Sequence, residues 1–470
     1  MKKIVLLYLL VLLFTACNTR VNIVNRSSEK PVVLPDYTDV TIPCNIAPLN
    51  FSVQGLTDAA LVIKGDVDSI CLTTSDGNFD IPLEEWHQLL AAQKGHALQF
   101  TVCRSTENGW EGLQPFNVQV SNDSIDPYVV YRLLPPGYGL WNRMSLMQRN
   151  LENFQEEEIY ANRYGRGNCV NCHSFAGGKA DTWQVHVRHN YGGTFVVRQG
   201  KMQKLNVQGA KAKPVYPAWH PDGRFIAYST NNTFFHIHTA DVNRWEVMDD
   251  GSDVMVVDTE NGEVFTAPQF TQKEKYETFP AFSPDGKWLY YCTAQAVDTL
   301  TRQFQGVRYS LCRIPFDAQH RTFGTQVDTL YSAPQQGSSA TMPRVSPDGK
   351  WLCFVRQPYG QFATCHLDAT LQLVNLENGE ITSTQELGSW HSWSQNSRWM
   401  IFASKRDDQR YGRLYIVHVA PDGSTSKAFV LPQPEATHFY DMQLNTYSIP
   451  ELVSGHVDMT PQQFQQSISK

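Results

Sequence analysis

Four segments of fourteen residues repeat along the chain without gaps. They are YPAWHPDGRFIAYS from Tyr216, FPAFSPDGKWLYYC from Phe279, MPRVSPDGKWLCFV from Met342 and WHSWSQNSRWMIFA from Trp390. Each unit combines a short strand, a turn (Pro-Asp-Gly in the first three) and a strand of β-branched or aromatic residues. The starts lie 63, 63 and 48 residues apart, which suits four-stranded units better than helical repeats. One unit cannot bury a core alone, so the repeat predicts an all-β chain with radially stacked sheets.

This unit resembles the PD40 (WD40-like) repeat of TolB-like β-propellers, whose hallmark is x-P-x-[FW]-S-P-D-G-[KR]. The resemblance covers roughly 127–450. It implies a six-bladed propeller, so two further blades should precede Tyr216. Asn150-Leu151-Glu152-Asn153 repeats the string at Asn375–Asn378, which places a first blade near 130–162.

The second blade is expected to begin at Cys169 and to include Trp183–Arg188 and Thr194–Arg198. In that register His173 takes the place of His220, and of Ser283, Ser346 and Ser394 in later blades. The stretch from Tyr440 to Pro450 is expected to close the ring, which leaves 451–470 as a C-terminal tail.

The region 36–125 carries no PD40 unit and is expected to form a separate small β-rich domain. Alternating runs predict strands of a β-sandwich-like domain at Leu61–Lys64, Ile70–Thr74, Leu98–Cys103 and Phe116–Val120. Pro82–Lys94 predicts one short helix. We find no catalytic pattern in this domain, so we interpret it as a spacer or docking module.

The first residues have the features of an exported lipoprotein. Met1-Lys2-Lys3 is followed by an apolar run from Ile4 to Phe14, which is too short to span a bilayer permanently and indicates a cleaved signal. Phe14-Thr15-Ala16-Cys17, at the end of the predicted signal region 1–17, resembles a bacterial lipobox, in which cleavage leaves Cys17 as a lipidated N-terminus. The alternative is an ordinary signal peptide. The polar segment 18–35 suits a tether, and Asn18 favours sorting to the outer membrane, facing the periplasm.

Cys169-Val170-Asn171-Cys172-His173 fits the attachment site of a covalent c-type haem. Cys169 and Cys172 would form the thioethers, and His173 would be the proximal ligand of the iron. A dithiol redox motif, half of a zinc site and a structural disulfide are the alternatives. The export signal supports haem, because the same route leads to the compartment in which such haems are loaded.

The distal haem ligand is not evident from a motif. His186 is our first choice and His220, which replaces the serine of the repeat, is the second; both could instead be structural. Further candidates are His189, His236, His238, His391 and Met202, of which His391 replaces the proline of the repeat. Arg163 and Arg166 could pair with the haem propionates.

Composition limits the classes of partner. A net charge of -7 and a pI near 6.1 argue against nucleic acid or an anionic membrane surface as the partner. Of ten cysteines, seven remain after lipid and haem are assigned, so a full disulfide framework is excluded. Cys292 and Cys312, and likewise Cys353 and Cys365, could pair or remain buried thiols.

Three functions follow as hypotheses. The first is a lipid-anchored envelope cytochrome that exchanges single electrons with a donor or acceptor in the cell envelope. The second is a TolB-like scaffold that docks an envelope protein, with a structural or sensory haem or none. The third is haem enzymology, which would need an open sixth coordination site.

Overall fold

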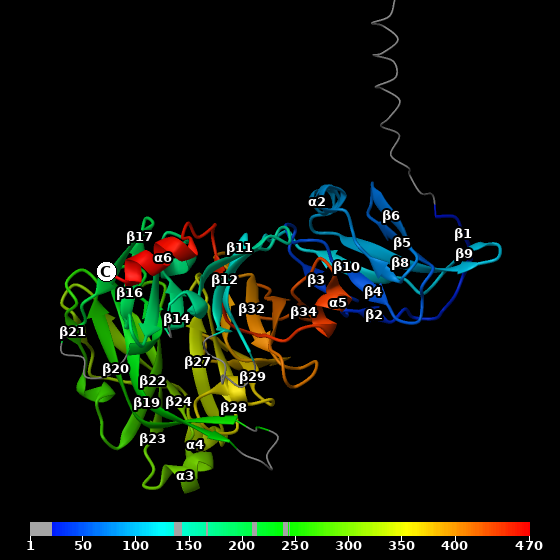
Figure 1. The fold of residues 1–470 in the computed structure, drawn as a ribbon. Coiled ribbons are helices and arrows are strands. Elements are labelled where there is room, and N and C mark those ends of the chain that lie inside the picture. The colour runs from blue at the N-terminus through cyan, green and yellow to red at the C-terminus, as the bar shows by residue number, and fades with distance from the viewer. Residues whose placement is uncertain (1–20, 136–142, 166–167, 209–213, 238–242, 244) are drawn as a thin grey trace, which may run out of the picture. The chain divides into compact units, whose positions relative to one another are not determined.

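The computed structural model describes residues 21–135, 143–165, 168–208, 214–237, 243 and 245–470, so the predicted lipobox and Cys17 lie outside the described residues. The chain divides into two units (Figure 1). The first contains the N-terminal region up to Asn122 together with Pro432–Asp441, and the second contains Asp123–Leu431 and Met442–Lys470. The predicted boundary near 125 is therefore within a few residues of the observed one.

The first unit is a small β-rich domain with one longer helix, as the sequence predicts. One sheet contains β1 (Ile23–Arg26), β3 (Thr41–Ile42), β5 (Ala59–Lys64), β6 (Ser69–Thr74), β8 (Ala97–Thr106), β9 (Gly109–Gly112) and β10 (Phe116–Val120). A second sheet contains β2 (Val33–Leu34), β4 (Phe51–Val53) and β7 (Asn78–Phe79). Helix α2 (Leu83–Ala92) buries Trp86, Leu89 and Leu90, and the Trp86 indole N–H donates to the Ile46 carbonyl at 2.9 Å.

Two segments of this unit differ from the sequence-based expectation. Strands β1 and β2 lie inside the segment 18–35 that we expected to be a tether, and β1 pairs in parallel with β9. Because β1 is an exposed edge strand, its sequence carries no alternating pattern. The segment 432–441 was expected within the propeller, but its helix α5 (Ala436–Asp441) belongs to the first unit, where Thr437 donates to the Ser52 hydroxyl at 2.6 Å.

The second unit is a six-bladed β-propeller, built in the described residues from six antiparallel sheets. From the inner strand outward, the first blade contains β35 (Thr446–Val453), β11 (Tyr128–Leu134), β12 (Ser145–Asn150) and β13 (Glu156–Ala161), and the second contains β14 (Cys169–Phe175), β15 (Thr182–Arg188), β16 (Gly193–Arg198) and β17 (Lys201–Leu205). The third blade contains β18 (Pro214–Trp219), β19 (Phe225–Ile237), β20 (Trp245–Asp258) and β21 (Val264–Phe265), and the fourth contains β22 (Lys275–Phe282), β23 (Trp288–Gln295), β24 (Ser310–Asp317), β25 (Thr322–Phe323) and β26 (Asp328–Tyr331). The fifth blade contains β27 (Ser339–Val345), β28 (Trp351–Gln357), β29 (Thr370–Asn375) and β30 (Ile381–Leu387), and the sixth contains β31 (His391–Trp393), β32 (Trp399–Ser404), β33 (Arg413–His418) and β34 (Phe429–Val430). The predicted fold class is confirmed.

The inner strands form a closed ring. In order, β35, β14, β18, β22, β27 and β31 each contact the next, and β31 contacts β35 again. Strand β35 comes from the end of the chain but pairs antiparallel with β11, from Tyr128↔Val453 to Leu134↔Thr446. The C-terminal part of the chain therefore completes the first blade, a few residues beyond the segment that the sequence indicated.

The Pro-Asp-Gly turns hold the first two strands of a blade together. The Ser283 hydroxyl donates to Asp285 at 2.5 Å and accepts the Trp288 N–H at 3.0 Å. Ser346 repeats both bonds with Asp348 and Trp351. The glycine of the turn has a positive φ, 71° at Gly286, which few other residues adopt. These aspartates are therefore structural, as their place in the repeat indicates.

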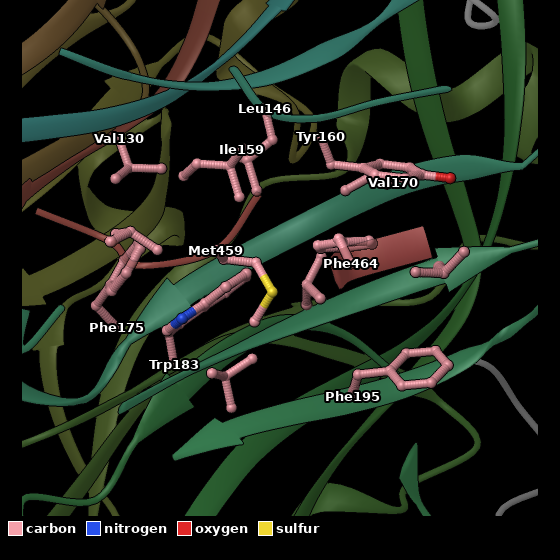
Figure 2. Packing of buried hydrophobic residues seen from close by; sticks show 14 of the residues in the cluster. Val130, Leu146, Ile159, Tyr160, Val170, Phe175, Trp183, Phe195, Met459 and Phe464 are labelled. Atoms are coloured by element: carbon pink, nitrogen blue, oxygen red, sulfur yellow. The ribbon is translucent and has the colours of Figure 1, made fainter. Parts of the chain in front are cut away.

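The last twenty residues form no loose tail. Helix α6 (Pro461–Ile468) begins with a capping box at Thr460 and buries Phe464 and Ile468. Phe464 stacks on Tyr160 with ring centroids 4.2 Å apart. Figure 2 shows Phe464 among Trp183, Met459 and Tyr160 in the core of the first two blades. The spacing of four residues puts both apolar side chains on one helix face, a pattern too short to stand out in the sequence.

The packing of α6 predicts a large effect of one substitution. Phe464→Ala is expected to lower the free energy of unfolding by about 3–5 kcal/mol, because a fully buried aromatic side chain is removed. Gln462→Ala on the exposed face of α6 is the control and should change it by less than about 0.5 kcal/mol. Chemical denaturation followed by circular dichroism measures both. Equal stability of the two variants would show that α6 is not docked.

Candidate functional site

The C-x-x-C-H motif lies on the inner strand of the second blade. Cys169 pairs with Arg188, Asn171 with His186, and His173 with Val185, so β14 is an integral ladder strand next to β15. The ladder shifts at Cys172, whose φ is +40°. A β-bulge at this point lets the backbone turn two consecutive residues toward the propeller axis.

The same bulge recurs in other blades and defines the register. Positive φ values occur at Tyr216 (52°), Phe279 (49°), Met342 (53°) and Ile449 (51°). Cys172 is their structural equivalent, and His173 stands where Pro217, Pro280 and Pro343 follow the bulge. The predicted register, with His173 at the place of His220, is therefore wrong by three residues. The error arises because the second blade has no Pro-Asp-Gly turn to align on, and uses η4 (Ala176–Gly178) instead.

The bulges surround a small axial cavity of about 30 Å³. Its lining consists of Cys172, His173, Tyr216, Pro217, Phe279, Pro280, Met342, Pro343, Arg344, Trp390, His391 and Ile449. The Tyr216 ring lies 4.2 Å from Phe279 and 6.0 Å from Trp390, measured between centroids, so aromatic side chains gather at this point of the axis. Space of this size holds about two water molecules.

His173 is the residue of this cavity whose side chain lacks hydrogen-bond partners. Its residue is 2% accessible to solvent, and neither ring nitrogen has a hydrogen-bond partner of normal geometry among the described residues. Burial, followed by the Arg132 guanidinium, lowers the pKa of His173 to about 3, against the opposing effect of the nearby Val130 and Ile449 carbonyls. At neutral pH the ring is therefore neutral. Each unsatisfied nitrogen costs about 1–3 kcal/mol, which a ligand or water in the cavity would offset.

A porphyrin does not fit the motif while the ring is closed. Covalent haem requires both thiols and the imidazole at one edge and one face of the macrocycle. Cys172 lies near Tyr216 and Tyr228 of the third blade, whereas His173 lies near Val130 and Ile449 of the first. A ligand as large as a porphyrin also needs a cavity of several hundred Å³, which is about tenfold more than the volume of the axial cavity. Haem attachment stays a prediction that requires β14 to leave the ring.

The two predicted distal ligands lie elsewhere. His186 is on β15 opposite Asn171, and its Nδ1 is 3.0 Å from the Thr194 hydroxyl. His220 belongs to a turn, with Nε2 3.1 Å from the Gly286 carbonyl oxygen and Nδ1 2.8 Å from Asp222. Neither lines the axial cavity, so the structure does not bring them to His173. Arg163 pairs with Glu158 at 2.7 Å, and Arg166 is outside the described residues.

The structure instead brings His391 to the cavity that His173 lines. The residue is 3% accessible, and its nitrogens lie 3.3 Å from the Ser389 and Cys353 carbonyl oxygens. Burial and the nearby Arg344 lower the pKa of His391 to about 4. The sequence did carry a signal, because His391 and His173 each replace the proline of their blade.

A second region was not indicated by any motif. Strands β19 and β20 pair beyond their blade to Ile237↔Trp245, and form a long hairpin. An open groove of about 1030 Å³ lies between the base of this hairpin and the ends of β22 and β23. Its charged lining residues are Asp250, Asp253, Lys273, Glu274, Lys275 and Asp298. Two carboxyl groups adjoin lining residues in the sequence, and burial raises the pKa of Asp249 to about 7 and that of Glu277 to about 8.

Several further features limit the chemistry. All nine described cysteines are free thiols, so the pairs Cys292/Cys312 and Cys353/Cys365 are not disulfides. Within the described ranges, no three His, Cys, Asp or Glu side chains are grouped so that they could hold a metal ion. In the same ranges, no helix is long and apolar enough to cross a membrane.

Comparison with known proteins shows that the fold is similar to that of several solved structures, but it assigns the chain to no family. No family model and no curated protein matches this chain. Among solved structures, TolB from Acinetobacter baumannii is 13% identical with a TM-score of 0.44, over 79% of this chain and 85% of its own. The periplasmic gluconolactonase of Pseudomonas aeruginosa is 13% identical with a TM-score of 0.34, over 65% and 97%. The tricorn protease is 14% identical with a TM-score of 0.36, over 76% and 34%.

The recurring bulge predicts that strand β14 tolerates a proline in place of His173. His173→Pro is expected to fold and to change the free energy of unfolding by less than about 1 kcal/mol, because proline stands at this position in three other blades. Val185→Pro is the matched control. It lies in the middle of β15, which pairs on both sides, and should cost about 3 kcal/mol or more. Loss of folding in His173→Pro would contradict the register.

Proposed function

We propose that this protein is an envelope-anchored β-propeller that docks a protein partner through the β19–β20 hairpin and the adjoining groove. The observation that carries the proposal is the exposure of large apolar side chains on the hairpin. Phe234, Phe235 and Ile237 are 38%, 43% and 57% accessible. Clustered exposed aromatic and aliphatic groups are typical of interaction surfaces.

Described residues of the hairpin form contacts that hold β19 and β20 against their neighbours. Asn243 accepts the Leu367 N–H at 3.0 Å, and Glu246 lies 3.4 Å from His366. Asn231 near the base donates to Asp249 at 2.6 Å. Preorganisation of this kind lowers the entropic cost of binding.

The groove indicates the chemistry of the partner. Four carboxylates and two lysines give its lining a formal excess of negative charge. A partner segment that carries basic residues next to apolar ones would complement both the groove and the hairpin. The predicted signal and lipobox ending at Cys17 support a position in the cell envelope, with the outer membrane and its periplasmic side as the expected location.

Substitution of the hairpin tests the proposal. Phe234→Ser with Phe235→Ser should reduce covalent capture of envelope partners by chemical cross-linking about 10-fold or more, because central apolar contacts dominate binding energy. Val67→Ser, an exposed apolar residue of the first unit at 85% accessibility, is the control and should leave capture unchanged. An equal loss in both variants, or in neither, would refute docking through the hairpin.

Covalent haem at Cys169, Cys172 and His173, with single-electron exchange with an envelope donor or acceptor, is the second candidate. The C-x-x-C-H spacing favours it, and it requires β14 to leave the closed ring, because the axial cavity of about 30 Å³ has no room for a porphyrin. A pyridine haemochrome spectrum of protein made with a haem-maturation system tests it directly. A reduced α-band that survives denaturation, and is altered in Cys169→Ser but not in Cys71→Ser, would support haem. A spectrum without bound haem would leave the docking function alone.

A further inference from the structure

A second small cavity lies beside Lys405, which directly follows β32. Its volume is about 20 Å³, and its polar lining includes Thr364, His366, Ser389, Ser404, Lys405 and Thr446. This is enough for one particle slightly larger than a water molecule. None of its lining residues belongs to the axial cavity or to the docking groove.

Lys405 has no carboxylate of its own, because Asp408, the acidic neighbour that favours its charged form, is paired with Arg413 at 3.2 Å. Among the cationic side chains of the lining, His366 lies 3.4 Å from Glu246 and Arg406 lies 2.6 Å from Glu386. Within the described residues, Lys405 has no carboxylate at ion-pair distance, and its ammonium donates to the Thr364 carbonyl at 3.0 Å. Burial lowers the pKa of Lys405, which expresses the cost of a cation in this position.

Hydroxyl protons add further donors to the cavity. The Ser404 hydroxyl oxygen accepts from the Arg406 backbone N–H at 3.3 Å and from its Nε at 3.0 Å. Ser389 Oγ accepts from Thr364 at 3.5 Å, and Thr446 Oγ1 accepts from the Gly412 N–H at 3.4 Å. Because each oxygen already accepts a bond, the proton of each hydroxyl remains available to donate.

A cavity lined by hydroxyl donors and by an ammonium that forms no ion pair within the described residues has the chemistry of an anion site. Its volume excludes phosphate-sized and larger groups. We propose that this cavity binds one monatomic anion of about the size of chloride, held by Lys405 and the hydroxyls of Ser389 and Ser404. The bound anion would join the loop at Thr364 to the end of β32 and the start of β35, and so support ring closure. The proposal is independent of partner docking and of haem.

Thermal unfolding of the full chain tests the proposal, with chloride replacing gluconate at constant ionic strength. Gluconate is too large for the cavity, so the midpoint of unfolding should rise as chloride replaces it. Lys405→Met should abolish the rise. Lys350→Met, an exposed lysine, should retain it. Ser389→Ala should weaken the apparent affinity for chloride on the order of 10-fold. This second variant keeps the test decisive if Lys405→Met folds poorly.

Crystals soaked in bromide give the direct readout. We expect an anomalous peak within hydrogen-bond distance of Lys405 Nζ that is absent in Lys405→Met. Water alone in the cavity, or a chloride dependence that persists in Lys405→Met, would overturn the proposal.

Discussion

The pairing of β35 with β11 is the interaction on which the propeller depends. Without it, the first blade would lack its inner strand, and the ring of inner strands would be open between β31 and β14. Sheets stacked radially gain stability only when each has a neighbour on both faces. The partly buried ion pair between Arg344 on β27 and Glu451 on β35, at 2.9 Å, links the inner strand of another blade to β35. In the sequence, Pro432–Asp441 of the other unit precedes the segment that contains β35.

Ring closure also determines what the C-x-x-C-H motif can do. In a surface loop, two thiols and an imidazole at this spacing are free to converge on a porphyrin. Here they belong to an inner strand whose bulge places Cys172 and His173 in the structural positions of a bulge residue and a proline. In the closed ring these residues therefore complete an inner strand, and haem attachment stays a prediction that requires this strand to leave the ring. Neither ring nitrogen of His173 has a hydrogen-bond partner of normal geometry among the described residues, so this side chain is the unsatisfied polar group of the axial cavity.

The repeat made most of the propeller predictable. Where Pro-Asp-Gly turns follow the inner strand, as at Ser283 and Ser346, the blades lie where the sequence places them. The second blade has no such turn, so its register could not be read from spacing alone. Edge strand β1 and helix α6 were missed because short elements take their stability from tertiary contacts, such as Phe464 on Tyr160. The docking groove and the cavity beside Lys405 depend on contacts between blades, which no local pattern encodes, whereas His391 is visible in the sequence as a replacement of the repeat's proline.

Thiol accessibility tests the central claim most directly, that the motif is an inner strand of a closed ring. Native protein is treated with an alkylating reagent, then unfolded and treated with a second, and the modified peptides are identified by mass spectrometry. The account predicts that Cys172, 6% accessible, takes only the second reagent, while Cys71 on the first unit takes the first. Rapid native labelling of Cys172 would contradict the closed ring. Failure of Cys169 and Cys172 to take either reagent, with the added mass of haem, would contradict the strand assignment.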